Sequence, residues 1–267
     1  MSVSEPKVVF NKPETYTSWD QDYYPPLAEW FYDEAVRRML RAMQVQPNQT
    51  VLDAGCGPGV HSIRAARFGA QVTAADVSAV ALQEAAVRVE RAGYNRQVNF
   101  QQADLTRLPF TDASFDHVFS WGVIIHIPTV EDALREMVRV VKPGGSLALY
   151  VNNLAALDVK GETMGRMMLR RPPLSLEHHP LGASRWYTFH GARLWLWRFD
   201  MPALARHVEG LGMQRTYRMA GEFTEFQRRC KGVFRNGLLH LNNLYLRMRL
   251  PAWAASANLL VFQKPRG

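Results

Sequence analysis

Apolar runs of strand length and segments of helical periodicity alternate between residues 50 and 153. The apolar runs are "TVLDA", "AQVTAAD", "QVNFQQAD", "FDHVFSW" and "SLALYVNN". The helical segments are "HSIRAARFG", "SAVALQEAAVRVERAG" with Ser78 as N-cap, and "TVEDALREMVRVV" with Thr129 as N-cap and "KPGG" after it. Alternating strands and helices predict a parallel sheet covered by helices on both faces.

Further elements are expected on either side of this region. A helix is predicted over Leu27–Met43, directly after two prolines. Near the C-terminus, "MPALARHVEGLG" predicts a helix, and "MQRTYRMAG" and "SANLLVFQKP" predict two more strands. We therefore expect an α/β fold with a doubly wound, mostly parallel seven-stranded sheet whose last strand runs antiparallel.

Two long segments interrupt this pattern. Residues 153–199 are rich in Arg, Pro, Met and Trp, and we expect an irregular segment there. About three dozen residues between the last two strands have helical periodicity. Their predicted buried face comprises Phe234, Leu238, Leu241, Tyr245 and Met248, with Arg235, Asn242 and Arg249 outside it.

Composition limits the class of protein. The 267 residues are 47% hydrophobic and 21% charged, and no apolar run approaches the ~20 residues that span a bilayer. The N-terminus lacks the pattern of a secretory signal. Only Cys56 and Cys230 occur, and neither has neighbours at zinc-ligand spacing. We expect a cytoplasmic protein with no metal site.

The net charge of +8 is concentrated in the second half of the chain. Residues 160–249 contain 16 Lys and Arg against 6 Asp and Glu. Such a basic surface suits nucleic acid, an anionic membrane or an acidic small substrate, and it is equally consistent with a solvated surface.

The stretch "VLDAGCGPG" places three glycines at alternate positions after the first apolar run. Gly55, Gly57 and Gly59 predict a tight, bare turn at which a ligand can approach the backbone. Val60 stands where a dinucleotide fingerprint needs a glycine, and no Lys of a phosphate-binding loop follows. The turn alone indicates only a nucleotide-like ligand.

Acidic residues at three consecutive strand ends narrow the choice of ligand. Asp53 precedes the glycines, Asp76 ends the second strand and is placed to bind both hydroxyls of a ribose, and Asp104 follows the third. The Asp104 carboxylate could accept a hydrogen bond from the adenine amine, and the backbone amide of Leu105 could donate one to a ring nitrogen. The three carboxylates favour a cationic adenosine derivative, and S-adenosylmethionine, a sulfonium, meets that requirement.

With these features, the sequence resembles the class I (Rossmann-like) S-adenosylmethionine-dependent methyltransferases. Five blocks carry the resemblance in order: "VLDAGCGPG", "VTAADVS", "QQADLTRLPF", "SFDHVFSWGVIIHIPT" and "RVVKPGGSLALY". The resemblance implies that Asp53, Gly55 and Gly57 surround the methionine moiety and that Ser120 and Trp121 form the pocket floor. The full set of implied cofactor-binding residues is Asp53, Ala54, Gly55, Cys56, Gly57, Gly59, Asp76, Val77, Asp104, Leu105, Ser120 and Trp121.

The resemblance also implies a domain organisation. Residues 1–48 would form an arm and a helix that cover the cofactor site. Residues 49–267 would form the methyltransferase domain, with cap insertions at about 153–199 and 222–255. In this family, acceptor specificity usually comes from such added parts.

The implied reaction is methyl transfer to an oxygen or nitrogen of a small-molecule or lipid-like acceptor. His126 is the candidate general base, and a packing histidine is the competing interpretation. Further candidates for the base or the acceptor wall are His178, His179 and His190, the aromatic residues Trp186, Tyr187, Trp195 and Trp197, and the arm residues Tyr16, Trp19, Tyr23 and Tyr24.

Two alternatives remain open on the sequence. One is an NAD(P)-dependent Rossmann oxidoreductase, against which Val60 and the absence of a Tyr-x-x-x-Lys pair argue. The other is a non-catalytic protein of the same fold that contacts an anionic membrane peripherally. Cyclopropanation of lipids would use the same cofactor. Nucleic acid is disfavoured as a partner because no recognised RNA-binding module is present.

Overall fold

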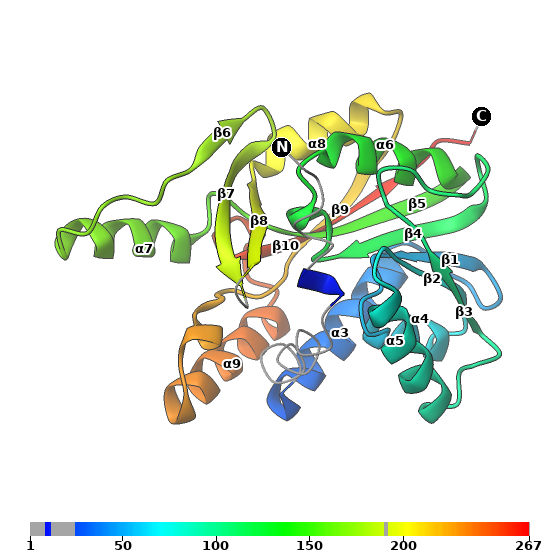
Figure 1. Cartoon of the computed structure of the whole chain (residues 1–267), viewed down its shortest axis with the longest axis horizontal. Coiled ribbons are helices and arrows are strands. Elements are labelled where there is room, and N and C mark those ends of the chain that lie inside the picture. The colour runs from blue at the N-terminus through cyan, green and yellow to red at the C-terminus, as the bar shows by residue number, and fades with distance from the viewer. Residues whose placement is uncertain (1–8, 12–24, 190–191, 267) are drawn as a thin grey trace.

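The computed structural model describes residues 9–11, 25–189 and 192–266. A seven-stranded sheet in the order β3-β2-β1-β4-β5-β10-β9 forms its centre (Figure 1). The strands are β1 Thr50–Ala54, β2 Gln71–Asp76, β3 Val98–Gln102, β4 Phe115–Trp121, β5 Val141–Asn152, β9 Gln214–Ala220 and β10 Ala257–Gln263. The strand β10 lies antiparallel between β5 and β9, and the pairs among β1–β5 are parallel. The predicted sheet and its antiparallel last strand are confirmed.

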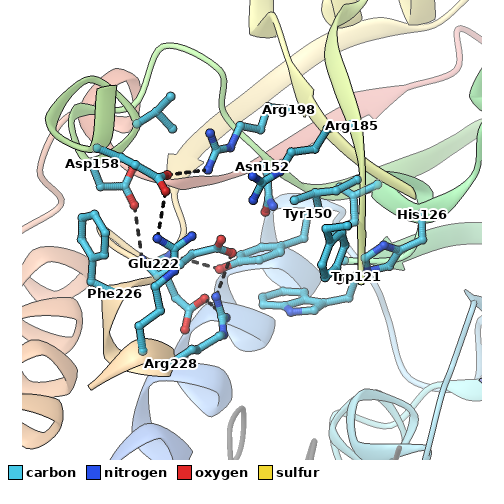
Figure 2. A pocket seen from close by; sticks show the side chains of 18 of the residues that line it. Trp121, His126, Tyr150, Asn152, Asp158, Arg185, Arg198, Glu222, Phe226 and Arg228 are labelled. Atoms are coloured by element: carbon cyan, nitrogen blue, oxygen red, sulfur yellow. Dashed lines mark hydrogen bonds and ion pairs between the residues drawn. The ribbon is translucent and has the colours of Figure 1, made fainter. Parts of the chain in front are cut away.

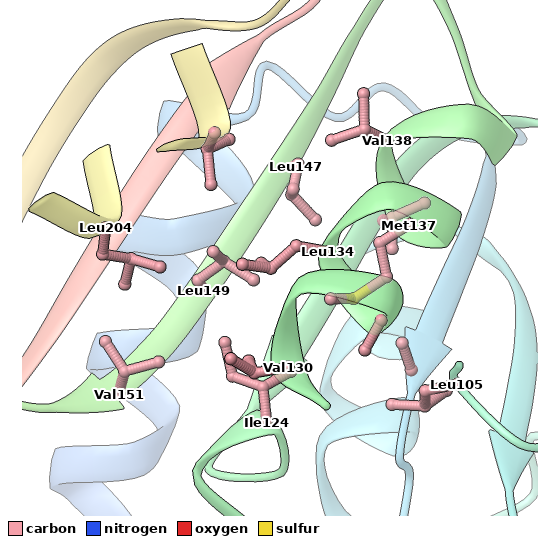
Figure 3. Close-up of a cluster of buried hydrophobic side chains, with 14 of the residues drawn as sticks. Leu105, Ile124, Val130, Leu134, Met137, Val138, Leu147, Leu149, Val151 and Leu204 are labelled. Atoms are coloured by element: carbon pink, nitrogen blue, oxygen red, sulfur yellow. The ribbon is translucent and has the colours of Figure 1, made fainter. Parts of the chain in front are cut away.

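Helices cover both faces of this sheet, as predicted. They are α3 Pro26–Ala42, α4 Val60–Arg67, α5 Ala79–Arg91, α6 Val130–Val140, α8 Met201–Gly210 and α9 Gly232–Arg247. Successive side chains of a strand point to opposite faces, and β5 illustrates this alternation. Leu147, Leu149 and Val151 pack against α6 and α8 (Figure 3), whereas Ala148 and Tyr150 join the core shared with α3, α4 and α9.

Ends of elements match the predicted signals in part. The Ser78 hydroxyl caps α5 by accepting from the Ala81 amide at 3.0 Å, whereas Thr129 makes no side-chain cap bond at α6. The strand β5 begins at Val141, five residues before the predicted start. Its pairing with β4 is interrupted after Val141 and resumes at Ser146, so the "KPGG" stretch bulges within the strand rather than preceding it.

The expectation of an irregular segment at residues 153–199 is wrong. This segment forms the helix α7 (Leu157–Met168) and a second sheet of β6 (Glu177–His179), β7 (Gly182–Phe189) and β8 (Ala192–Phe199). On β8, Trp195 and Trp197 face the core of the main sheet, while Leu196 faces the other way. Both faces of β8 therefore carry apolar side chains, which hides the period-two signal of a strand.

The buried face predicted for the last helix is also wrong, except at Tyr245, which is buried as predicted. In α9, Phe234 is 81% exposed and Met248 is 59% exposed, whereas Leu239 and Leu246 are buried. Asn242, predicted to lie outside the buried face, is buried as well. Its amide pairs with the backbone of Thr224, accepting from the N–H and donating to the carbonyl at 3.1 Å each. Satisfied hydrogen bonds let a polar side chain occupy this core position.

Short 3-10 helices complete the described chain: η1 Ile124–His126, η2 Phe226–Arg229 and η3 Ala252–Ala254. Of these, η1 follows β4 and contacts β8, and η2 lies beside α9. They place the insertions next to the carboxyl ends of β4 and β5. None of the described helices is long and apolar enough to cross a bilayer.

Candidate active site

The turn between β1 and α4 carries the three glycines. Gly55 has a φ of 89°, and a Cβ on it would lie 2.4 Å from a methyl group of Val123. Gly59 has a φ of 77°, and its Cβ would lie 2.9 Å from Cβ of Ala85 on α5. Gly55 thus lets the turn approach the loop after β4, and Gly59 lets α4 approach α5.

The carboxylate of Asp76 fixes this turn to the tip of β2. One of its oxygens accepts from the Gly57 amide at 2.9 Å and the other from the Ser78 amide at 2.9 Å. Burial raises the pKa of Asp76, and these backbone bonds oppose the rise. The Val77 amide also bonds to this carboxylate, and its remaining lone-pair capacity is open to a ligand.

Asp53 lies in β1 and is fully enclosed. Its carboxylate accepts from the Ser62 hydroxyl on α4 at 2.6 Å. Burial raises the pKa of Asp53 to about 7, the Ser62 bond opposes this, and the nearby charge of Asp76 adds to it. Neither Asp53 nor Asp76 has an ion pair among the described residues. Two adjacent buried carboxylates without a cation fit a positively charged adenosine ligand.

The other predicted cofactor residues occupy the same strand ends, with varied contacts. The carboxylate of Asp104 accepts from the amide and hydroxyl of Thr106 at 3.0 and 2.7 Å. The side chain of Leu105 is buried in the core. Ser120 is buried and donates to the Ala54 carbonyl at 2.9 Å, which ties β4 to β1. Cys56 is buried in the turn, and burial raises its thiol pKa. Val77 accepts at its carbonyl from Gln102.

Trp121 ends β4 and begins a second region of the site. Its ring stacks on Tyr150 of β5 with centroids 4.0 Å apart and 8° between the planes. The His61 ring also lies near Trp121: the two ring centroids are 4.7 Å apart and the ring planes are tilted. Trp121 also lines a cavity of about 390 Å³, so it connects the turn after β1 with that cavity.

His126 in η1 also lines this cavity and is buried. Its Nδ1 lies 2.8 Å from the Trp195 carbonyl, which can only accept, so Nδ1 carries the proton and Nε2 has the lone pair. Burial lowers the pKa of His126 to about 4, although the bond to Trp195 and the charge of Glu225 oppose this. The imidazole is therefore neutral at pH 7. It also anchors β8 to the core, as the packing interpretation expected.

Figure 2 shows the cavity between the strand tips and the insertions. The core side is lined by Tyr32, Trp121, Gly122, Ile125, His126, Tyr150 and Asn152. The insertions supply Asp158, Val159 and Glu162 from α7, Arg185, Tyr187, Leu196 and Arg198 from the hairpin, and Glu222, Glu225, Phe226, Arg228 and Arg229 after β9.

Glu222 forms the centre of a buried polar network in this wall. It accepts from the Tyr32 hydroxyl at 3.3 Å and from Nε2 of Gln227 at 3.0 Å, and it pairs with Arg228. Its amide donates to the Tyr150 hydroxyl at 3.0 Å. Burial raises the pKa of Glu222, and Arg228 opposes the rise. The network fixes the segment after β9 against β5 and α3.

The sequence interpretation missed most residues of this wall. Tyr150 and Asn152 were detectable, because they lie at the carboxyl end of a predicted parallel strand. Arg185 and Arg198 gave no signal once their segment was expected to be irregular. His179 bonds to the Ser184 hydroxyl and His178 is exposed, and neither lines the cavity. His190, Tyr16, Trp19, Tyr23 and Tyr24 lie outside the described residues.

Part of the N-terminal arm is described and reaches both regions. The Phe10 carbonyl accepts from the Ser78 hydroxyl at 2.6 Å, beside Asp76. The Phe10 ring lies 5.7 Å from the His126 ring. Within the described chain, no three His, Cys, Asp or Glu side chains are grouped to hold a metal ion.

Comparison with known proteins finds a family match over part of the chain. The family described as "Methyltransferase domain" matches residues 52–149. The chain is 36% identical over 145 residues to Methyltransferase GfsG of Streptomyces halstedii, which covers 54% of the chain and 52% of that relative. It is 32% identical over 124 residues to Sterol 24-C-methyltransferase ERG6B of Gibberella zeae (45% and 33%) and 32% identical over 157 residues to O-methyltransferase resE of Aspergillus sclerotiorum (56% and 60%).

These matches span less than two thirds of each relative's length. A solved S-adenosylmethionine-dependent methyltransferase from Methanosarcina mazei superposes with a TM-score of 0.60 at 17% identity, covering 86% of this chain and 98% of that one. The family match favours S-adenosylmethionine over a nicotinamide cofactor. The match identifies residues 52–149 as a methyltransferase domain, and the sheet order agrees with the class I S-adenosylmethionine-dependent methyltransferase fold that the sequence resembles.

Proposed function

We propose that the protein transfers a methyl group from S-adenosylmethionine to an oxygen or nitrogen of a small-molecule or lipid-like acceptor. The observation that carries this proposal is the position of the cavity. Trp121, the last residue of β4, lines it, and β4 pairs with β1, which leads into the glycine turn. An acceptor in the cavity would therefore lie next to a cofactor in the turn.

The residues at the strand tips would hold the cofactor. Bound there, S-adenosylmethionine supplies a methyl group on an electrophilic sulfonium. Asp53 and Asp76 would balance its positive charges, and Asp76 would accept hydrogen bonds from the ribose hydroxyls. The arm would cover this site, because Phe10 already bridges the start of α5 and His126. The protein's task is to align the acceptor and exclude water.

His126 would remove the proton from a hydroxyl or amine acceptor. Its Nε2 is unprotonated at neutral pH, and the Trp195 carbonyl holds the ring in one tautomer. The base would act in the wall of the cavity, where the acceptor lies. Glu222 is a weaker candidate because Arg228, Gln227 and Tyr32 already engage its oxygens.

The variant His126→Asn tests this role. Asparagine can still donate to the Trp195 carbonyl, so the hairpin stays anchored, but it offers no basic nitrogen. We expect kcat to fall by about 10²- to 10⁴-fold while the affinity for S-adenosylhomocysteine stays unchanged. Acceptors are found by incubating the protein with methyl-labelled cofactor and a metabolite extract, and detecting labelled products by mass spectrometry. An unchanged kcat contradicts the base assignment.

Failure to bind either S-adenosylmethionine or S-adenosylhomocysteine at millimolar concentration in calorimetry would overturn the proposed function as a whole. Labelled products that carry the methyl group on carbon would replace the oxygen or nitrogen assignment. His126→Gln is the matched variant for the anchor: it offers no group at the position of Nδ1, so it is expected to lower the melting temperature.

We further propose that the protein attaches peripherally to anionic membranes through α7. This helix has no buried residue and projects from the body of the molecule (Figure 1). Its end exposes Met167, Met168 and Leu169 beside Arg170 and Arg171. Apolar side chains flanked by arginines suit a negatively charged lipid surface.

Sedimentation with vesicles tests this attachment. We expect binding to vesicles of phosphatidylcholine and phosphatidylserine that weakens with salt, and no binding to phosphatidylcholine alone. The double variant Met167→Ser, Met168→Ser should lose this binding. Val233→Ser, which changes an exposed apolar residue of α9, should retain it. Absence of salt-sensitive binding at low ionic strength removes the proposal.

A further inference from the structure

Arg185 on β7 is a cation in the wall of the cavity. Its side chain makes no hydrogen bond or ion pair with any of the residues that the structure describes. Its Nε is enclosed and has no acceptor. A guanidinium stays charged in proteins, and a partly buried charge without a partner is costly. Such a group needs an explanation.

The hairpin directs Arg185 to the cavity together with three neighbours. Arg185 stands directly opposite Leu196 in the register of β7 and β8, so the two side chains share one face of the hairpin. By the same alternation, Tyr187 and Arg198 lie on that face, and all four line the cavity. The opposite face carries Trp195 and Trp197 into the core.

Three of the four acidic residues in the cavity lining pair with arginines other than Arg185. Glu162 is shared by Arg198 at 3.4 Å and Arg229 at 2.9 Å. Glu222 and Glu225 both pair with Arg228. Asp158 accepts from the Glu225 amide at 3.3 Å and makes no ion pair within the described chain.

The lining as a whole holds four arginines and four acids, but the formal charges that act on Arg185 are those of Arg198 and Arg229 against that of Glu162. Partial burial lowers the pKa of Arg185, and the charges of Arg198 and Arg229 lower it further, with Glu162 opposing them. In addition, Nη1 of Arg198 is enclosed and has no acceptor. Two neighbouring guanidinium groups with unused donors form a site for an oxyanion.

We propose that the methyl acceptor carries an oxyanionic group, a carboxylate or a phosphate, that binds to Arg185 and Arg198 on the cavity-facing side of the β7–β8 hairpin. This inference rests on the proposed function, because it names the acceptor class of the same site. The oxyanion would accept the hydrogen bonds for which the Arg185 side chain has no partner among the described residues.

The remainder of the cavity defines the body of this acceptor. Ile125, Trp121 and Tyr150 from the core and Leu196, Tyr187 and Phe226 from the insertions line the cavity. These apolar and aromatic walls suit a ring or a short chain between the oxyanion and the atom that receives the methyl group. Figure 2 shows Arg185 and Arg198 on the hairpin side and His126 at the strand tips. The acceptor is therefore an amphipathic acid held by its charged end.

Binding of small aromatic probes tests this inference. The probes are 4-hydroxybenzoate, phenyl phosphate and the neutral 4-hydroxybenzamide, titrated in the presence of S-adenosylhomocysteine and followed by ligand-observed NMR. We expect one or both anions to bind at least about tenfold more tightly than the amide, since hydrogen bonds to charged groups are the stronger ones. The preferred anion distinguishes a carboxylate from a phosphate.

Variants then assign the preference to Arg185. Arg185→Met should abolish it, and Arg185→Lys should retain a reduced part of it, because the charge remains and the bidentate fork is lost. Arg193→Met is the matched control: Arg193 lies on the same hairpin, over the Trp186 ring and outside the cavity lining, and its loss should leave the preference unchanged.

The proposal is overturned if neither anion binds at millimolar concentration, if the amide binds as well as the anions, or if Arg185→Met keeps the preference. Calorimetric titration of S-adenosylhomocysteine on the same samples separates this outcome from failure of the proposed function. Cofactor binding without anion preference removes only the acceptor inference, whereas absence of cofactor binding removes the proposed function.

Discussion

At the scale of single residues, Asp76 connects folding with binding. Its two oxygens accept from the Gly57 and Ser78 amides, so the carboxylate holds the glycine turn and the start of α5 together. The same carboxylate is the one predicted to hold a ribose. Replacing a residue with both roles should weaken ligand binding more than replacing a carboxylate that only supports the backbone.

We expect Asp76→Ala to weaken the binding of S-adenosylhomocysteine by about 1–3 kcal/mol, because a charge-assisted pair of hydrogen bonds is lost. Asp116→Ala is the matched control. Asp116 also accepts from a backbone amide, that of Thr50 at 2.9 Å, but it lies at the start of β4, away from the strand tips. Calorimetry measures both. Equal affinities for the wild type and Asp76→Ala would contradict the ribose assignment.

At the scale of elements, the core could be read from the sequence and the insertions could not. Strands β1, β2 and β4 have the predicted positions because their residues are buried or half-buried and the strands are bounded by glycines, acids or turns. The β7–β8 hairpin depends on partners far away in the chain. Its tryptophans bury against η1, where the Trp197 indole donates to the Ile127 carbonyl at 2.9 Å. A local sequence pattern carries no information about such long-range contacts.

The same distinction applies to the site. Asp53, Gly55 and Asp76 could be predicted as ligand residues because a ligand turn needs small residues and polar groups at fixed places on a sheet. Arg185 was not predicted, because its importance depends on the ion pairs that other arginines make with the nearby acidic residues. Only the assembled structure shows which charges remain unpaired.

The helix α9 offers a direct test of its revised buried face. Asn242→Ala removes both hydrogen bonds to the Thr224 backbone and leaves buried groups unpaired, so we expect a loss of about 1–3 kcal/mol in unfolding free energy. Phe234→Ala changes a residue that was predicted to be buried but is exposed, and we expect less than about 0.5 kcal/mol. Urea unfolding compares them. A larger loss for Phe234→Ala would restore the original face.

At the scale of the whole molecule, buried titratable groups link stability to pH in opposite directions. His117 and His126 have pKa values lowered to about 4 by burial, so their contribution to stability is lost as the pH falls from 6.5 to about 4. Asp53 has a pKa raised to about 7, so the folded state favours its protonated form. Its contribution is lost as the pH rises from 3.8 to about 7.

Asp53→Asn isolates this contribution, because asparagine resembles the protonated acid and does not titrate. We expect the unfolding free energy of the variant, relative to that of the wild type, to increase as the pH rises between about 4 and 7 and to level off above that range. Urea unfolding of both proteins without ligand, at steps across this range, measures the difference. Asp116→Asn should give a difference of opposite slope at lower pH, since the Asp116 pKa is lowered to about 2 by its bonds to Lys142 and Thr50 despite the opposing effect of burial. A pH-independent difference for Asp53→Asn would mean that Asp53 is ionised in the ligand-free protein, and the paired carboxylates would then carry their full negative charge before the cofactor arrives.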